Sequence, residues 1–461
     1  MSETSRANPA RFLQGSIFRH VVVMTLTSAL GLMTLFLVDL ADLYFLSSLK
    51  NNSITAAIGF GGTIDFANLS LAIGAGIAAV ALVARNVGAG NVERAKRLAS
   101  NALYMSLAIS AVYTAVVAMF IAPILTALGA TGETARQATI FIWTLSPGFI
   151  CLAGALSCSF SLRGLGDARR AMFITLTSAL TTLILDPLFI FKFGWGIQGA
   201  AAANAVAYAT SFAIGLHGLA RVHHFLAPFS WKAFREDLPE FWGIALPAIV
   251  SQLATPFAAG YLNYAFAKYG DEVVVAGTVV NRVVPVAFGV IFSLSGAVGP
   301  IIGQNFGAGN FPRVKRALRD GLAFAVVYSV VTSGILYLLR HSLISTFHIS
   351  GRAAALVDYF ATYIAISWVF LGGLFVAAAA FNNLGKPTYS TWTNWGRATL
   401  GTIPFAMLGA AYAGAEGILV ATAVGGAVFG LGSMILAYRL VNKLNGETLP
   451  GGQPSAAGSR Q

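Results

Sequence analysis

Long apolar runs occupy most of this chain and constrain its fold more than any other feature. The hydrocarbon core of a bilayer is about 30 Å thick, which a helix of about 20 residues spans. Twelve runs of this kind lie near residues 18–46, 54–83, 101–128, 135–161, 170–192, 199–221, 237–268, 273–303, 321–345, 353–382, 388–412 and 414–440. Because backbone polar groups in lipid must bond within their own segment, the pattern predicts an all-α membrane protein with twelve transmembrane helices.

The chain also repeats a motif at an offset of 219 residues. Residues 86–91 read Asn-Val-Gly-Ala-Gly-Asn, and residues 305–310 read Asn-Phe-Gly-Ala-Gly-Asn. Each half has six apolar runs, so both halves enter the membrane from the same side, and repeats of this kind are related by an axis along the membrane normal. We therefore predict two six-helix lobes related by a pseudo-two-fold axis: an N-terminal lobe at 1–221, a cytoplasmic linker at 222–238, a C-terminal lobe at 239–445 and a disordered tail at 446–461.

The positive charge of the chain indicates its orientation. The net charge is +12, but the Lys and Arg side chains gather on one side of the predicted membrane. The N-terminal tail, the even-numbered loops and the C-terminal tail hold 21 of them, and the odd-numbered loops hold 6. By the positive-inside rule, both termini are expected in the cytoplasm, with the chain in the plasma (inner) membrane. The charge is thus explained without a nucleic acid partner.

Acidic residues inside the apolar runs point to chemistry. Asp39 and Asp42 lie three residues apart in the first run and can share one helix face. Asp65 and Asp186 lie in the second and fifth runs. An ionised Asp near the bilayer centre costs about 2.5–3.5 kcal/mol on insertion scales, so such residues are by default functional. A crowded group of carboxylates favours binding a proton, although the same oxygens could also hold a hard cation.

A second set of residues forms a candidate substrate cleft. Arg282 lies in the middle of an apolar run of the second half, where it could pair with an acid across the cleft or satisfy the carbonyl groups of a broken helix. Aromatic side chains could hold flat cations by cation–π contacts; the candidates are Phe60, Phe66, Phe141 and Trp143. Arg397 is closer to a helix end, where we expect it to extend to the membrane surface.

Short specific blocks are spread over nearly the whole chain. They are Leu-Ala-Asp at 40–42, Gly-Ala-Gly-Asn at 88–91, Leu-Arg-Gly-Leu-Gly-Asp at 162–167, Leu-Asp-Pro at 185–187, Leu-Pro at 246–247 and Asn-Arg at 281–282. Together they resemble the multidrug and toxic compound extrusion (MATE) family, and within it the DinF-like branch. The resemblance implies a two-lobed exporter of twelve helices that uses an inward H+ or Na+ gradient to move organic, often cationic, compounds outward.

The resemblance also implies which residues hold the coupling ion. Asp42 and Asp186 match the two acids of the family's N-terminal lobe. A family asparagine one turn before the second acid is Thr182 here, and a family threonine in the sixth helix is Asn204, so each position still offers one oxygen. The proline that kinks the first helix of the family falls near Thr27, which puts a bending motion of that helix in doubt.

We therefore predict a secondary antiporter, not an enzyme, that exports small cationic or amphipathic compounds. The coupling ion is predicted to be H+ rather than Na+, with no cofactor and no bound metal centre, in a monomer. The alternative within the same superfamily is a lipid-linked oligosaccharide flippase, which would favour a cleft with several Lys or Arg. Here only Arg282 and, second to it, Arg397 qualify, which argues against the flippase. The apolar runs lack the mid-membrane histidine that a membrane enzyme could use for catalysis. The pair Asp39 and Asp42 leaves a carboxylate protease as a remaining alternative. A primary pump is not expected, because the sequence has no nucleotide-binding loop.

Overall fold

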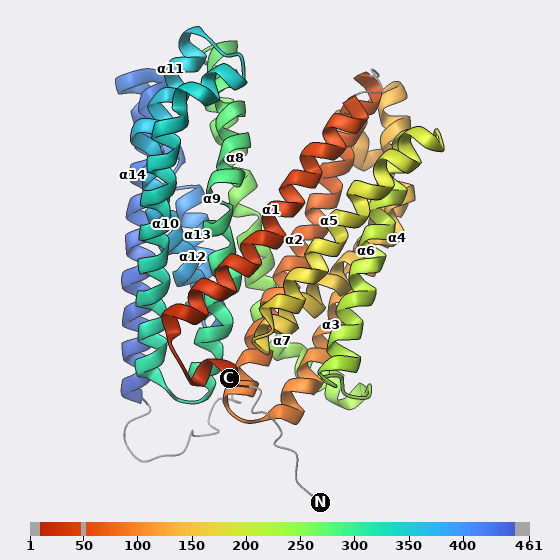
Figure 1. Ribbon diagram of the computed structural model, residues 1–461, viewed down its shortest axis with the longest axis vertical. Helices are drawn as coiled ribbons and strands as arrows, with labels where there is room; N and C mark the ends of the chain where they lie inside the picture. The colour runs from red at the N-terminus through yellow and green to blue at the C-terminus, as the bar shows by residue number, and fades with distance from the viewer. Residues whose placement is uncertain (1–9, 48–51, 448–461) are drawn as a thin grey trace, which may run out of the picture.

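The computed structural model describes residues 10–47 and 52–447, all in helices and short connections (Figure 1). The first half holds η1 (Arg11–Leu13), α1 (Ile17–Ser47), α2 (Asn52–Gly88), α3 (Val92–Ala127), α4 (Gly132–Gly164), α5 (Ala168–Pro187), η2 (Leu188–Lys192), α6 (Ile197–His217) and η3 (Gly218–Val222). The second half holds α7 (Trp231–Gln252), α8 (Ala254–Ala267), α9 (Asp271–Gly307), α10 (Phe311–Thr346), α11 (Gly351–Tyr359), η4 (Phe360–Ile364), η5 (Ala365–Ser367), α12 (Trp368–Asn383), α13 (Pro387–Ala398) and α14 (Ile403–Glu447).

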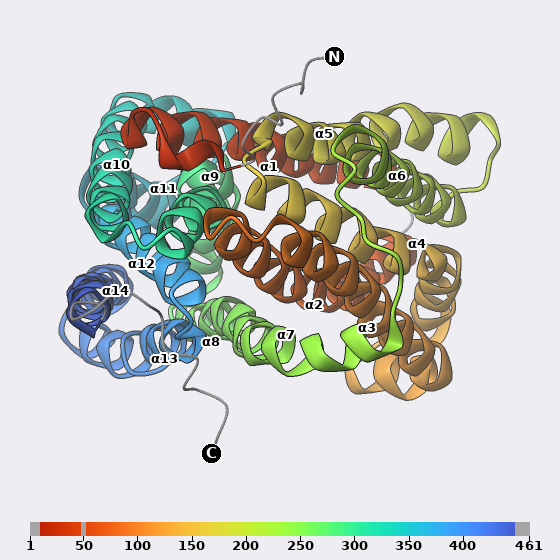
Figure 2. The same cartoon turned by 90° about the horizontal axis from the view of Figure 1, so that it is seen from below.

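The helix bounds reproduce the repeat seen in the sequence. Adding 219 to the bounds of α2 gives those of α9, and adding it to the bounds of α3 gives those of α10. The same offset carries α4 onto the span from α11 to α12. Seen from below, the two halves form two bundles side by side, with α2 to α6 in one and α9 to α14 in the other (Figure 2). The predicted all-α, two-lobed fold is confirmed.

The single element α14 contains the end of the eleventh predicted span and the whole of the twelfth, and it reverses direction at Gly414. Ala413 and Gly414 have non-helical backbone angles, and φ of Gly414 is +60°, a conformation that glycine adopts without strain. A Cβ on Gly409 would lie 2.0 Å from the carbonyl oxygen of Gly417, so the chain runs back along itself there. The part of the chain that the structure describes therefore has eleven apolar helical stretches long enough to cross a membrane, and the reversal inside one of them, 387–447, divides it in two.

Three spans of the second half are interrupted. A turn at Leu253 separates α7 from α8, η4 and η5 separate α11 from α12, and residues 399–402 separate α13 from α14. Two of these breaks have a local cause, because Pro256 and Pro404 cannot donate a helical hydrogen bond and crowd the preceding turn. The spans that correspond to the first two, α1 and α4, are unbroken helices in the first half.

Two differences from the predicted boundaries are small. Helix α7 begins at Trp231, inside the predicted linker 222–238, because Ser230 caps it by accepting a hydrogen bond from the backbone N–H of Ala233. Helix α14 continues to Glu447, into the predicted tail. The remainder of that tail, 448–461, lies outside the described residues.

The two halves contact each other along several helix pairs, α1 with α9 and α2 with α7 among them, and α2 crosses α9 at the end of the molecule where α1 begins and α14 ends (Figure 1). A Cβ on Gly88 would lie 1.9 Å from the carbonyl oxygen of Gln304, and a Cβ on Gly307 would lie 2.0 Å from that of Arg85. These two pairs are related by the offset of 219. The crossing is therefore symmetric, and each half contributes one glycine without which the backbones could not approach so closely.

Hydrogen bonds between the two halves also stabilise the crossing of α2 and α9. The side-chain amide of Gln304 on α9 donates through Nε2 to the carbonyl oxygen of Gly164 at 2.8 Å. Its side-chain oxygen Oε1 accepts from the backbone N–H of Phe12 at 3.0 Å. Arg85 on α2 donates to the carbonyl oxygen of Asn382 at 3.3 Å. Each half thus places the second helix of its repeat against the end of the fourth helix of the other half. We refer to this region as the interlobe crossing.

A buried carboxylate organises the connection between α4 and α5, next to the interlobe crossing. Asp167 caps α5, forms an ion pair with Arg170, and accepts a hydrogen bond from His223 at 2.9 Å. Burial alone would raise the pKa of Asp167, but the hydrogen bonds from His223 and Arg170 hold that pKa well below its usual range. The negative charge of Asp167 is therefore kept at all physiological pH values.

We expect Asp167→Asn to lower the free energy of unfolding by about 2 kcal/mol at pH 7, since hydrogen bonds to charged groups contribute roughly 1.5–3 kcal/mol each while asparagine still caps a helix. The pKa is depressed in the folded state, so the stabilisation is present above the unfolded pKa of about 3.9 and is lost as pH falls through the folded pKa. Thermal unfolding of the two proteins at pH 7 and in acid measures this. Equal unfolding temperatures at pH 7 would contradict it.

Candidate functional site

The end of α5 places a carboxylate in the interior of the first half. Asp186 is 0% exposed and precedes Pro187, after which the chain continues as the π-helix η2. Thr182 lies one turn earlier on the same face of α5. Its hydroxyl group donates to Oδ1 of Asn204 on α6 at 3.4 Å, and Nδ2 of Asn204 donates to the carbonyl oxygen of Ala200 at 3.2 Å. The structure thus brings together Thr182, on the helix that carries Asp186, and Asn204 on the neighbouring helix α6.

A second carboxylate is tied to the same helix α6. The hydroxyl group of Tyr208 donates to Oδ2 of Asp65, on α2, at 3.1 Å. Tyr208 lies one turn after Asn204, so both side chains lie on one face of α6. Tyr208 was not among the predicted site residues, although it lies four residues after Asn204 in the sequence and could have been expected on the same helix face. Helix α6 therefore links the neighbourhoods of Asp65 and Asp186 through adjacent polar side chains.

The other two predicted acids lie on α1. Helix α1 runs unbroken through Asp39 and Asp42, but the side chains of these two residues lie outside the described residues, so their role stays a prediction. The helix itself is firmly placed against α5: a Cβ on Gly31 would lie 2.1 Å from Oγ1 of Thr175. Helix α1 is also unbroken at Thr27, whose hydroxyl group bonds to the carbonyl oxygen of Val23 at 2.7 Å.

The aromatic candidates of the first half are split between core and surface. Phe141 is 7% exposed and packs in a buried cluster, with Phe60 at its margin. Phe66 and Trp143 are 47% and 53% exposed. The structure does not bring these four rings into one described cavity, and their role in substrate binding stays a prediction.

The two arginines of the second half have positions that the sequence did not reveal. Arg282 is exposed and lines a recess of about 310 Å³ with Thr278 and Phe347. Arg397, which we expected to extend to the membrane surface, instead points inward: its Nη2 donates to Oγ1 of Thr255 on α8 at 3.4 Å, and its side chain lines a second, larger cavity. The expectation for Arg397 was wrong because α13 ends at Ala398 within the bundle, so the helix end that carries Arg397 faces the cavity and not the membrane surface.

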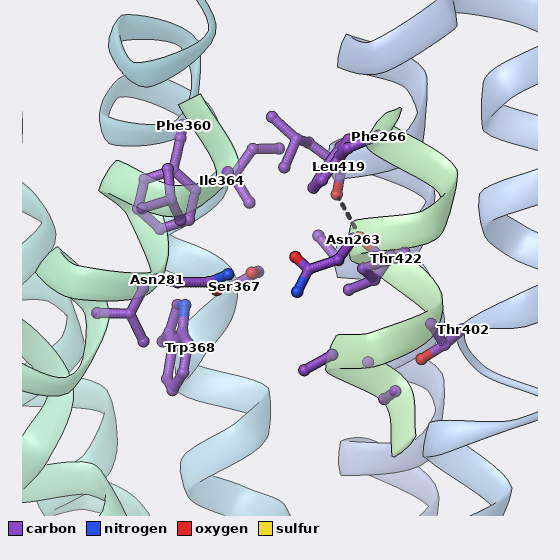
Figure 3. Close-up of a pocket in the computed structure, with 18 of the residues that line it drawn as sticks. Asn263, Phe266, Asn281, Phe360, Ile364, Ser367, Trp368, Thr402, Leu419 and Thr422 are labelled. Atoms are coloured by element: carbon purple, nitrogen blue, oxygen red, sulfur yellow. Dashed lines mark hydrogen bonds between the residues drawn. The ribbon is translucent and has the colours of Figure 1, made fainter. Parts of the chain in front are cut away.

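This second cavity lies wholly within the second half and has a volume of about 380 Å³ (Figure 3). Helices α8, α9, α12 and α14 form its walls, and we refer to it as the C-lobe cavity. Its polar lining residues are Thr255, Asn263, Asn281, Ser367, Arg397, Thr402 and Thr422, and its aromatic ones are Phe266, Phe292, Phe360 and Trp368. None of the residues that line it is Asp or Glu. The sequence analysis named only Asn281 and the two arginines from this region and predicted no cavity here.

Comparison with known proteins shows to which family this architecture belongs. The MatE family model matches residues 28–188 and again 247–408, one match in each half. The FAD transporter of Shewanella oneidensis is 28% identical over 442 residues, which cover 95% of this chain and 98% of the relative. The multidrug export protein MepA of Staphylococcus aureus is 24% identical over 448 residues, covering 95% and 97%.

Solved structures have the same fold. The MATE transporter VcmN of Vibrio cholerae in its bent form superposes with a TM-score of 0.87 at 23% identity, covering 93% of this chain and 98% of that one. A multidrug resistance MATE family transporter in an outward-facing conformation gives a TM-score of 0.90 at 22% identity, covering 96% and 100%. Since the family model accounts for most of both repeats, this chain is a multi-pass membrane transporter that belongs to the MATE family.

Proposed function

We propose that this protein is a secondary active antiporter that exports small organic compounds across the plasma membrane in exchange for protons. The observation that carries the proposal is the fully buried Asp186, with Thr182 one turn earlier on α5 and hydrogen-bonded to Asn204 on α6. A carboxylate in such a place is costly to ionise, so a change in its protonation can drive a change in helix packing. The relatives named as multidrug export proteins support outward transport.

The packing of α1 on α5 supports a shared acid site. Gly31 contacts Thr175, and both helices rise from the same end of the molecule (Figure 1). Counting 11 residues onward from each contact residue reaches Asp42 on α1 and Asp186 on α5. At a rise of about 1.5 Å per residue, both positions are then about 16 Å further along their helices. This count supports a common level in the membrane for the two acids of the family pattern.

Helix α1 can carry the effect of protonation to the interlobe crossing. It packs along α5 of its own half and along α9 of the other half, where Ser293 donates to the carbonyl oxygen of Thr25 at 3.2 Å. In the proposed mechanism, a proton that neutralises the acid site lets α1 pack more tightly against α5. This movement weakens the contacts of α1 with α9 and shifts the equilibrium between the conformations that are open to opposite sides of the membrane.

Orientation in the membrane completes the proposal. The lobes contact each other at the end that carries most of the Lys and Arg residues, which the positive-inside rule assigns to the cytoplasm. The described conformation would then be closed to the cytoplasm, in keeping with its likeness to the outward-facing relative. The substrates named for relatives differ widely, from FAD to multiple drugs, so membership of the family does not by itself define the substrate.

Transport in proteoliposomes under separately imposed gradients tests the coupling ion. We expect substrate movement against its gradient when a pH gradient is imposed at equal Na+ on both sides. A Na+ gradient at equal pH is expected to give no more than the passive rate. Movement that follows only the Na+ gradient would overturn the choice of proton, and movement that follows neither gradient would overturn antiport.

The flippase alternative is not favoured by the C-lobe cavity. Binding a pyrophosphate-linked lipid calls for several cationic side chains in one place. The C-lobe cavity is lined by Arg397 as its one ionisable residue, and Arg282 faces a separate recess. The described part of the second half therefore offers a single guanidinium group where the flippase would need a cluster.

A further inference from the structure

The three helix breaks of the second half meet at the C-lobe cavity. Thr255 follows the break at Leu253, and Trp368 follows η5. Arg397 precedes the break at 399–402, and Thr402 is its last residue. Irregular backbone at membrane depth is tolerated where it lines a cavity or is buried in protein, and transporters build substrate sites from such interrupted helices. The coincidence of all three breaks with one cavity indicates a binding site rather than a packing defect.

Two amide side chains face each other across this cavity. Asn281 extends from α9 and Asn263 from α8, each toward the other (Figure 3). Both are exposed to the cavity, and neither makes a hydrogen bond to another described residue. Each amide therefore offers both donors and an acceptor to a ligand in the cavity. Together they can recognise the polar edge of a ring held between them.

The wall beside Asn281 is aromatic and rigid. The indole of Trp368 stacks on the buried ring of Phe288 with centroids 4.8 Å apart, and it meets Phe292 edge-on at 5.5 Å. These contacts fix the orientation of the indole. Phe360 and Ile364 lie on the same side of the cavity as Trp368 (Figure 3). A fixed aromatic wall of this kind favours a flat, apolar-faced ligand.

The electrostatics of the cavity exclude one class of ligand. Arg397 supplies its only ionisable side chain, and no ion pair joins Arg397 to a described residue. Positions equivalent to the acids of the first half are neutral here: at the offset of 219, Asp39 corresponds to Ala258 and Asp65 to Val284, both of which line the cavity. The halves have thus diverged, with acids in the first and a guanidinium group in the second.

We propose that the C-lobe cavity is a substrate site for planar, hydrogen-bonding heteroaromatic compounds that are neutral or carry an anionic group, and not for permanent organic cations. The ring lies against Trp368, its polar edge contacts Asn263 and Asn281, and the anionic group approaches Arg397. The volume of about 380 Å³ is within the range of sites for drug-sized ligands. The inference rests on the proposed transport function. It differs from the prediction made from the sequence, which expected a cationic or amphipathic substrate.

Equilibrium binding to the purified, full-length protein in nanodiscs tests the proposal with three planar probes. These are riboflavin 5′-phosphate, with an anionic group; lumiflavin, with the same ring and no charge; and ethidium, with a permanent positive charge. We expect the phosphate to bind most tightly, lumiflavin about tenfold more weakly, and ethidium more weakly than lumiflavin. Ethidium binding that is competitive with the flavins and at least as tight would overturn the proposal.

Variants separate the two contacts. Arg397→Gln should weaken binding of riboflavin 5′-phosphate about tenfold and leave binding of lumiflavin within twofold of the wild type. Arg397→Lys should restore most of the lost phosphate binding. Asn281→Leu should weaken binding of both flavins. Arg439→Gln is the matched control, because Arg439 is exposed near the end of α14 and does not line the cavity, and it should change the binding of neither flavin. Unchanged phosphate binding in Arg397→Gln would overturn the anion contact. Binding is measured without gradients, so it can succeed where proton-driven transport fails, and the two proposals are tested separately.

Discussion

Gly307→Ala is expected to reduce transport to below a tenth of the wild-type rate, and Gly88→Ala to do the same. The added methyl group would lie 2.0 Å from the carbonyl oxygen of Arg85 in the first variant and 1.9 Å from that of Gln304 in the second. Both neighbours are backbone atoms of a helix and cannot turn away as a side chain could. Overpacking of a well-packed contact costs about 1–3 kcal/mol, and a backbone clash belongs at the upper end.

The loss should come from a shift between conformations rather than from unfolding. The two glycines contact the opposite lobe only in the state in which the interlobe crossing is formed. A penalty of about 3 kcal/mol on that state changes its population relative to the alternative by roughly a hundredfold. Spin labels on the loops after α2 and α9, read as a distance distribution, measure the shift directly: the variants should show longer distances than the wild type.

Gly62→Ala is the control for both variants. It lies on α2, as Gly88 does, but nothing lies within 4 Å of the position of its Cβ. It should therefore transport and report distances as the wild type does. Wild-type transport together with unchanged distances in Gly88→Ala and Gly307→Ala would show that the crossing does not depend on close backbone contact.

Asp186→Asn is expected to abolish proton-driven export while the protein remains folded. Asparagine has nearly the same shape as aspartate but cannot bind and release a proton in the cycle. Removing a charge from a fully buried position need not destabilise the fold, since desolvation of buried charges is costly. The variant should therefore keep the thermal unfolding temperature of the wild type, yet give the same passive rate with and without a pH gradient.

A surface acid provides the comparison for this variant. Glu133→Gln removes a carboxylate at the start of α4 that pairs with Arg136 at 2.7 Å on the surface. It should leave gradient-driven transport unchanged. If Asp186→Asn responded to the pH gradient as strongly as Glu133→Gln does, Asp186 would have no role in coupling.

The number and order of the helices could be predicted because they are encoded locally. Each span is a run of apolar residues long enough for the bilayer, and the repeated motif recurs at the same distance in both halves. The helix bounds of α2 and α9 follow that offset to the residue. Membership of the MATE family followed from short blocks of specific sequence and is confirmed, while assignment to the DinF-like branch stays a prediction. The acids of the first half stood out because carboxylates are rare in apolar runs.

The C-lobe cavity could not be predicted in this way. Asn281 and Arg282 are adjacent, yet one lines the cavity and the other a separate recess, because successive residues of a helix point about 100° apart. The rotation of a helix about its axis depends on all of its neighbours. Arg397 appeared close to a helix end, and only the packing of α13 against α8 places it inside the bundle.

For this protein, the sequence by itself determined the twelve membrane spans, the duplication into two halves and the presence of acids in the first of them. Those properties depend on hydrophobicity and spacing along the chain. The tertiary structure alone decided which polar side chains share a cavity, where the two lobes contact each other, and which glycines permit that contact. These features depend on distances between residues far apart in the chain, such as Thr255 and Arg397 or Gly88 and Gln304, which no local pattern specifies.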